Sequence, residues 1–184
     1  MKIVVALTSG WEIETGKPYA SGCLRLEKLV QLLQEKKKID GVAIIGGWPD
    51  SMGLSEAQRY FNCLPESIRE SVTIIDGLGN NTVDDIISLV GSLRKKYGNS
   101  SSIELQLITS PYHFRRIWRT VVKLKCSAKM IESGEVRTLN PILNIILTFL
   151  NMVDPLWRSP GGRLMRTIAN KRARNYYLRS RDKK

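Results

Sequence analysis

The stretch IELQLITSPYHFRR, residues 103–116, joins a β-strand pattern directly to a helical pattern. Residues 103–108 are rich in apolar side chains, which favour a buried strand. A helix is expected from about residue 112 to residue 123, so Thr109 and Ser110 fall at the junction. A strand that leads through polar residues into a helix is the repeating unit of an α/β protein.

Apolar runs of this kind recur along the chain and alternate with helical patterns. The alternation predicts βαβ units and a Rossmann-like α/β fold, with a mainly parallel sheet of about five strands flanked by helices. Helices are expected around residues 26–33, over residues 55–64, and from residue 81 to a turn at 98–102. The predicted strands are residues 3–7, 41–45, 72–75 and 103–108, with residues 128–131 as a short fifth strand.

The chain divides into an α/β domain, residues 1–138, and a C-terminal extension, residues 139–184. Residues 142–153 are almost entirely apolar but too short to span a bilayer, which needs about 20 apolar residues. We expect this segment to form a helix that packs on the domain. Residues 163–179 are predicted as a basic amphipathic helix, which suits a membrane surface, a nucleic acid or an acidic partner, or is simply solvated.

Positive charge is concentrated in the extension. The net charge is +12, and residues 158–184 supply +9 of it through ten Lys or Arg side chains and one Asp. An electrostatic partner is therefore expected there, and an anionic membrane surface contacted through residues 139–184 is the main candidate. Nucleic acid ranks last, because the chain lacks an RNP-type aromatic motif, a zinc finger and a helix-turn-helix signature.

Cysteine usage and the amino-terminal sequence bear on location. Cys23, Cys63 and Cys126 are odd in number and form no CxxC pair, which argues against a disulfide framework or a zinc ribbon. The sequence MKIVVALTSG at the start lacks the long apolar core of a signal peptide. We therefore expect a reduced, cytoplasmic protein, with peripheral attachment to the inner face of the membrane as the alternative.

Small and polar residues follow each of the first four predicted strands. In open parallel sheets, ligands bind outside the carboxyl ends of the strands, so these residues are expected to meet in one cleft. Glycines allow close backbone approach, and the helix N-termini that follow favour phosphate or carboxylate. A small anionic metabolite is the expected ligand, but neither a GxGxxG nor a GxxxxGK[ST] motif is present. The residues are Thr8-Ser9-Gly10, Gly46-Gly47, Asp76-Gly77 and Thr109-Ser110.

His113 is the only histidine of the chain and precedes Arg115 and Arg116 in the predicted helix. An imidazole can act as a general acid or base near neutral pH, and an arginine fork binds phosphate or carboxylate through two hydrogen bonds. Glu56 is either a first-turn acid of its helix or a cleft acid able to pair with Arg25 or Arg116. If the protein is a hydrolase or transferase, His113 and Glu56 are the predicted acid/base residues.

The segment from Asn81 to Asp85 allows two interpretations. Asn81 or Thr82 can cap the following helix, and Asp84 and Asp85 in its first turn complement the helix dipole. Alternatively, these carboxylates lie at the mouth of the cleft and bind a ribose, a metal or a nearby arginine.

Five short motifs occur in one order along residues 3–131. They are Arg25-Leu26, Gly46-Gly47, Ser55-Glu56-Ala57, Asn81-Thr82 followed by Asp84-Asp85, and Thr109-Ser110-x-x-His113-x-x-Arg116. In this order they resemble the YdcF-like/SanA-like family, domain of unknown function 218. The chain departs from the family pattern at Thr8-Ser9-Gly10, where a Gly-rich turn is common, and at Asp84-Asp85, where Glu-Asn is usual.

The resemblance implies a Rossmann-like sheet whose pocket is built from Arg25, Glu56, Asn81, Thr82, Ser110, His113 and Arg116. It also implies that S-adenosylmethionine or a phosphorylated envelope precursor is a candidate ligand, because one family member binds S-adenosylmethionine and others are linked to envelope metabolism. No metal ligands are predicted. The complete set of predicted site residues is His113 and Glu56 as catalytic residues, and Ser9, Gly10, Arg25, Gly46, Gly47, Asn81, Thr82, Asp85, Thr109, Ser110 and Arg116 as ligand-binding residues.

Overall fold

The structure is a computed structural model, which describes residues 1–8, 10, 12, 15–35, 38–47, 53–76, 81–99 and 102–134 of the domain. Of the extension it describes residues 145, 146, 149, 152–156, 158–164, 167, 168 and 171. For residues 74–76, 112 and 116 it describes the backbone only. Ser9, Gly77 and the side chains of Asp76 and Arg116, all singled out in the sequence, therefore lie outside the described part.

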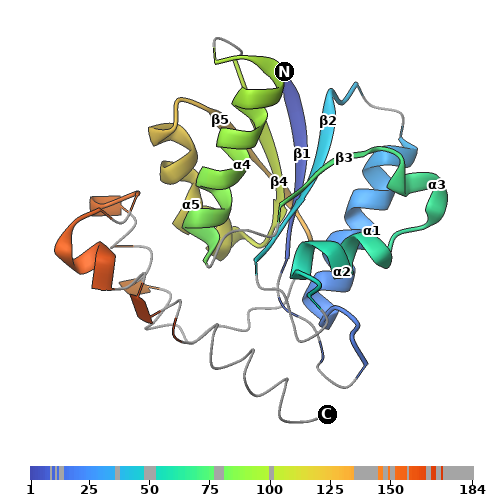
Figure 1. The fold of residues 1–184 in the computed structure, drawn as a ribbon, viewed down its shortest axis with the longest axis horizontal. Helices are drawn as coiled ribbons and strands as arrows, with labels where there is room; N and C mark the ends of the chain where they lie inside the picture. Colours follow the sequence, from blue (N-terminus) through green and yellow to red (C-terminus); the bar gives the residue numbers. More distant parts are fainter. Residues whose placement is uncertain are drawn as a thin grey trace.

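Within the described residues, five strands form one parallel sheet in the order β3-β2-β1-β4-β5. The strands are β1 (Lys2–Leu7), β2 (Gly41–Ile45), β3 (Val72–Asp76), β4 (Glu104–Thr109) and β5 (Ser127–Glu132). Helices connect them, so the predicted Rossmann-like α/β fold is confirmed (Figure 1). All five strands coincide with the predicted strands to within one residue at each end.

The helices of the domain are α1 (Ala20–Gln34), α2 (Glu56–Asn62), α3 (Glu66–Arg69), α4 (Thr82–Tyr97) and α5 (Pro111–Lys123). Only α3, a single turn after Pro65, has no counterpart among the predictions. Asn81 caps α4, since its Oδ1 accepts hydrogen bonds from the backbone N–H groups of Val83 and Asp84, both at 3.1 Å. The capping interpretation of this segment is thus confirmed, and Gly98, with φ of 91°, ends the helix.

The two faces of the sheet carry separate apolar layers, because alternate residues of a strand point to opposite sides. Val5 on β1 belongs to a core shared with α4 and α5, where Leu89 and Ile117 are almost fully buried. Val4 belongs to the other core, shared with α1 and α2, where Leu29 is fully buried. Burying a side chain of this size stabilises the fold by roughly 1.5–3 kcal/mol. Figure 1 shows the helices on both sides of the sheet.

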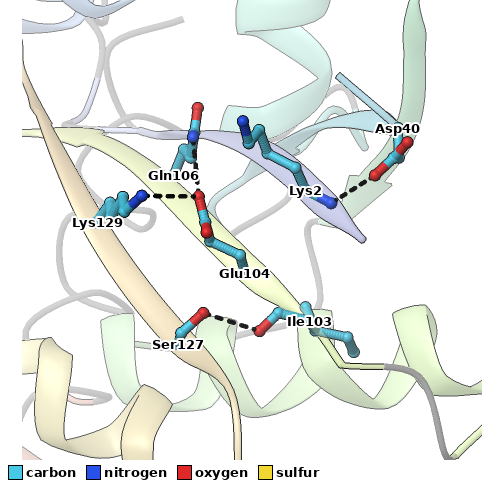
Figure 2. Close-up of polar contacts among 7 residues, drawn as sticks. All are labelled: Lys2, Asp40, Ile103, Glu104, Gln106, Ser127 and Lys129. Atoms are coloured by element: carbon cyan, nitrogen blue, oxygen red, sulfur yellow. Dashed lines mark hydrogen bonds and ion pairs between the residues drawn. The ribbon is translucent and has the colours of Figure 1, made fainter. Parts of the chain in front are cut away.

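Polar contacts secure the amino ends of the strands, at the opposite edge from the predicted cleft (Figure 2). The backbone N–H of Lys2 donates to Asp40 Oδ2 at 2.7 Å. On β4, Glu104 accepts a hydrogen bond from Gln106 at 3.0 Å and pairs with Lys129 of β5 at 3.7 Å. The bond from Gln106 and the charge of Lys129 help to lower the pKa of Glu104. Of these contacts, the exposed pair of Lys129 with Glu104 joins the side chains of the neighbouring strands β4 and β5.

The apolar segment expected to pack on the domain, residues 142–153, lies partly outside the described residues, so its packing stays a prediction. Its described residues Ile145, Ile146, Phe149, Met152 and Val153 are helical and between 47% and 69% exposed. Figure 1 shows the described parts of the extension, in orange and red, beside α5. A hydrogen bond of 2.7 Å from the buried Thr120 hydroxyl to the Pro155 carbonyl joins the extension to that helix. Among the described residues, no helix is long and apolar enough to cross a membrane.

Candidate functional site

The strand order reverses between β1 and β4, which makes this point the topological switch of the sheet. In open α/β sheets, ligands bind outside the carboxyl ends of the strands at such a switch point. The register pairs Ala6 with Ile108, so β1 and β4 end side by side at Leu7 and Thr109. Neighbouring strands lie about 4.8 Å apart. The polar residues that follow these two strands therefore face the same region.

Arg25 fixes the end of β1. Its side chain, on α1, is only 2% exposed. Its Nη1 donates to the carbonyl oxygens of Leu7 at 2.7 Å and of Thr8 at 3.0 Å. Buried backbone carbonyls need hydrogen-bond partners, and Arg25 supplies one to each of these two. The contacts suit a positioning role for Arg25 at the site rather than direct contact with a ligand.

Glu56 lies at the start of α2 and faces the same strand end. Its Oε2 accepts a hydrogen bond of 2.6 Å from the Thr8 hydroxyl. Loss of solvation on burial raises the pKa of Glu56 from 4.5 to about 6, and is only partly offset by the hydrogen bonds from Thr8 and the Gly10 backbone and by the charge of Arg25. A carboxyl with a pKa of about 6 exchanges protons near neutral pH, as a general acid or base must.

Two glycines allow the backbone to pack closely around Thr8. A Cβ on Gly46, the residue after β2, would lie 1.7 Å from the Thr8 hydroxyl oxygen. Gly10 has φ of 94°, a conformation that favours glycine, and its carbonyl accepts a hydrogen bond of 3.1 Å from the Tyr60 hydroxyl. Gly47 is buried beside Gly46. The loop after β1 is thus held between the ends of β2 and α2.

His113 forms a second group of polar contacts at the end of β4. Its ring is 7% exposed and lies in the first turn of α5. Nδ1 is 3.1 Å from the Thr109 hydroxyl, and Nε2 is 3.2 Å from the Thr82 hydroxyl at the start of α4. Both ring nitrogens therefore have hydroxyl partners. Proton transfer by His113 would have to pass through one of these hydroxyls or follow the opening of one hydrogen bond.

Ser110 is the residue between β4 and α5. The residue is fully buried, and its Oγ has no hydrogen-bond partner among the described residues. It does not cap its own helix. Buried hydroxyls are nearly always hydrogen-bonded, so an unsatisfied one at a switch point and a helix N-terminus needs an explanation.

Asn81 and Asp85, two further predicted residues, lie at the start of α4. Asn81 caps α4 and also donates from Nδ2 to Asp84 at 2.6 Å. Asp85 is 8% exposed in the first turn of the same helix. Arg115 is exposed on α5. The structure thus brings together Arg25, Glu56, Gly10 and Gly46 around the end of β1, and Thr82, Thr109 and His113 around the end of β4.

Two residues with central contacts were not among the predicted site residues. Thr8 was noted only as part of the turn after the first strand, yet its hydroxyl binds Glu56. Tyr60 is fully buried on α2, and its hydroxyl reaches Gly10. An aromatic residue on the apolar face of a helix gives no signal in the sequence beyond that of an ordinary core residue.

The arrangement combines a proton-exchanging carboxyl, a backbone turn rich in glycine and the N-terminus of α5, which has no side-chain cap, beside adjacent strand ends. Such a site can bind an anionic group through N–H donors and hydroxyls and can place an acid or base next to it. Among the described residues, no group of three or more His, Cys, Asp or Glu side chains could hold a metal ion.

Fold and site together define an α/β protein with a Rossmann-like parallel sheet and a polar site at its switch point. Comparison with models of protein families, with curated proteins and with solved structures finds no match to this chain. The resemblance to the YdcF-like/SanA-like family stays a prediction from short motifs in the sequence.

Proposed function

We propose that the protein binds a small anionic or nucleotide-like ligand at the carboxyl ends of β1 and β4. The observation that carries this proposal is the buried Ser110 hydroxyl, which lacks a partner among the described residues and lies at the switch point. Leaving such a group unsatisfied costs about 1–3 kcal/mol, which a ligand acceptor or donor would recover on binding.

The expected charge of the ligand follows from the groups around Ser110. The N-terminus of α5 lies at this edge of the sheet and has no side-chain cap, and backbone N–H groups there favour negative charge. The resemblance to the YdcF-like/SanA-like family adds S-adenosylmethionine and phosphorylated envelope precursors to the candidates. Phosphate esters and nucleotides share the anionic chemistry that the helix ends favour.

If the ligand is transformed, Glu56 is the residue best suited to acid/base chemistry. Its pKa of about 6 leaves it partly protonated near neutrality, and the Thr8 hydroxyl fixes its orientation. His113 would act as a positioning residue that holds the hydroxyls of Thr82 and Thr109, or as a proton acceptor through one of them. Hydrolysis and group transfer are the reaction classes that a single carboxyl and hydroxyl donors serve.

The test is a thermal-shift screen of the full chain against S-adenosylmethionine, S-adenosylhomocysteine, nucleotides, sugar phosphates and inorganic phosphate. A ligand at about 100 times its dissociation constant stabilises the folded state by roughly 2.7 kcal/mol. For a chain of this size, that stabilisation raises Tm by roughly 5–10 °C. No shift with any of these compounds would contradict the proposal.

The Ser110→Ala variant separates ligand binding from folding. Removing an unpaired hydroxyl should leave the free protein as stable as the wild type or slightly more stable, because no hydrogen bond is lost. The ligand-induced shift should nevertheless shrink or vanish. Ser71→Ala, at an exposed turn before β3, is the matched control and should keep the full shift. Equal shifts in wild type and Ser110→Ala would rule out Ser110 as a ligand contact.

A further inference from the structure

The described residues at the start of the extension form an apolar face directed to solvent. Ile145, Ile146, Phe149, Met152 and Val153 follow the spacing i, i+1, i+4, i+7 and i+8, which places them within about 120° of one another around a helix. Each is between 47% and 69% exposed. Contiguous exposed apolar side chains on a helix mark a surface that binds another apolar phase.

A basic pocket lies directly beside the end of this segment. It has a volume of about 490 Å³ and lies where α4 and α5 end against the extension. Its lining residues include four that carry positive charge, Arg94, Lys123, Lys125 and Arg158. None of the described residues that line it carries a carboxylate. Four cations around one pocket repel one another, and a bound anion relieves that repulsion.

The pocket is built by contacts that hold its walls in place. The Arg94 side chain donates a hydrogen bond to the carbonyl of Leu124, at the end of α5. Asp154 accepts from the backbone N–H groups of Arg158 at 2.9 Å and of Ser159 at 2.7 Å. Asp154, the acidic residue nearest to Arg158 in the sequence, therefore binds the backbone of the turn that carries this arginine. The hydrogen bond from Thr120 to Pro155 joins that turn to α5.

The apolar face and the pocket lie close together along the chain. Leu156, which lines the pocket, is three residues beyond Val153, so their Cα atoms are at most about 11 Å apart. Beyond the pocket, Arg163 and Lys171 are exposed on helical segments, together with the apolar residues Leu164 and Ile168. An anionic bilayer surface binds helices that carry apolar side chains next to cations. The apolar side chains then lie about 5–10 Å deep in the boundary between headgroups and acyl chains.

We propose that the extension and the ends of α4 and α5 form a docking surface for an anionic membrane, with a lipid headgroup phosphate held in the basic pocket. Ile145, Ile146, Phe149, Met152 and Val153 enter the boundary between headgroups and acyl chains, and the pocket cations contact the phosphate. The proposal does not rest on the ligand site at the carboxyl ends of β1 and β4.

Co-sedimentation of the full chain with vesicles tests this proposal. The protein should pellet with vesicles of phosphatidylcholine mixed with an equal amount of phosphatidylglycerol, and much less with phosphatidylcholine alone. A basic residue near an anionic surface contributes about 1 kcal/mol, so Lys123→Gln combined with Lys125→Gln should weaken binding by about 30-fold. Phe149→Ser combined with Val153→Ser should weaken it at least about tenfold.

Matched controls separate the surface from general charge. Lys28→Gln combined with Lys38→Gln removes the same charge from α1 and from the connection to β2, away from the pocket, and should retain most of the binding. The substituted apolar residues are exposed, so both of the test variants should keep the wild-type Tm. A full chain that stays in the supernatant with anionic vesicles, or that binds polynucleotide instead, would overturn the proposal. Undiminished binding by both double variants would overturn it as well.

Discussion

Replacing Glu56 by Gln should make the protein more stable at about pH 8 while leaving its stability at about pH 4 nearly unchanged. Burial raises the pKa of Glu56 from 4.5 to about 6, so the folded state holds this proton more tightly than the unfolded state. At a pH between these two pKa values, the folded state binds more protons than the unfolded state. The stability of the folded state therefore falls as the pH rises from about 4.5 to about 6. A difference of about 1.5 between the two pKa values corresponds to about 2 kcal/mol.

Glutamine has nearly the same shape as glutamate and keeps an oxygen that can accept the Thr8 hydroxyl, but it cannot ionise. The variant therefore escapes the cost of placing a charge in the buried site. Urea unfolding at a series of pH values, followed by tryptophan fluorescence, gives the free energy of unfolding for both proteins. The stability difference between variant and wild type should grow by about 2 kcal/mol from acid to alkaline pH.

Glu27→Gln is the control, because Glu27 is exposed on α1. The free energy of unfolding of the Glu27→Gln variant should change with pH in the same way as that of the wild type. If the Glu56→Gln curve also runs parallel to that of the wild type, Glu56 does not titrate with a raised pKa, and its assignment as the acid/base residue loses its physical basis.

Three further substitutions test the packing around the site by urea unfolding. Gly46→Ala should cost about 1–3 kcal/mol, because the new methyl group would collide with Thr8. Gly91→Ala, on α4 with open space around its Cβ position, should instead stabilise the protein by about 0.5–1 kcal/mol, and a loss at this position would contradict the description of α4. Tyr60→Phe should cost about 1 kcal/mol, because the Gly10 carbonyl loses its hydroxyl donor; an unchanged stability would show that this bond contributes little.

The strands could be predicted from the sequence because their apolar runs are short, β-rich and bounded by polar turns. Residues 41–45, for example, coincide with β2. The order of the strands could not be predicted, because nothing in a run such as residues 103–108 says which neighbour it pairs with. That order decides the site, since it places the end of β1 between the ends of β2 and β4.

The contacts of individual site residues were harder to predict than their location. The motifs around Glu56 and His113 indicated the correct edge of the sheet, but not that both imidazole nitrogens have threonine partners. The apolar content of residues 142–153 predicted a helix packed on the domain, but it could not show which face would be exposed. Phe149 and its described neighbours lie on a helical face that is exposed to solvent.

Lys129, which pairs with Glu104, also bears on how the protein could associate with a second copy of itself. Among the described residues β5 is an edge strand, and edge strands offer unpaired backbone groups to which another chain can add. Here Lys129 is 68% exposed, and Glu132 at the end of the strand is exposed as well. A second copy that added to this edge in parallel register would set lysine beside lysine and glutamate beside glutamate. Like charges side by side are destabilising, so these residues disfavour growth of the sheet by this pairing.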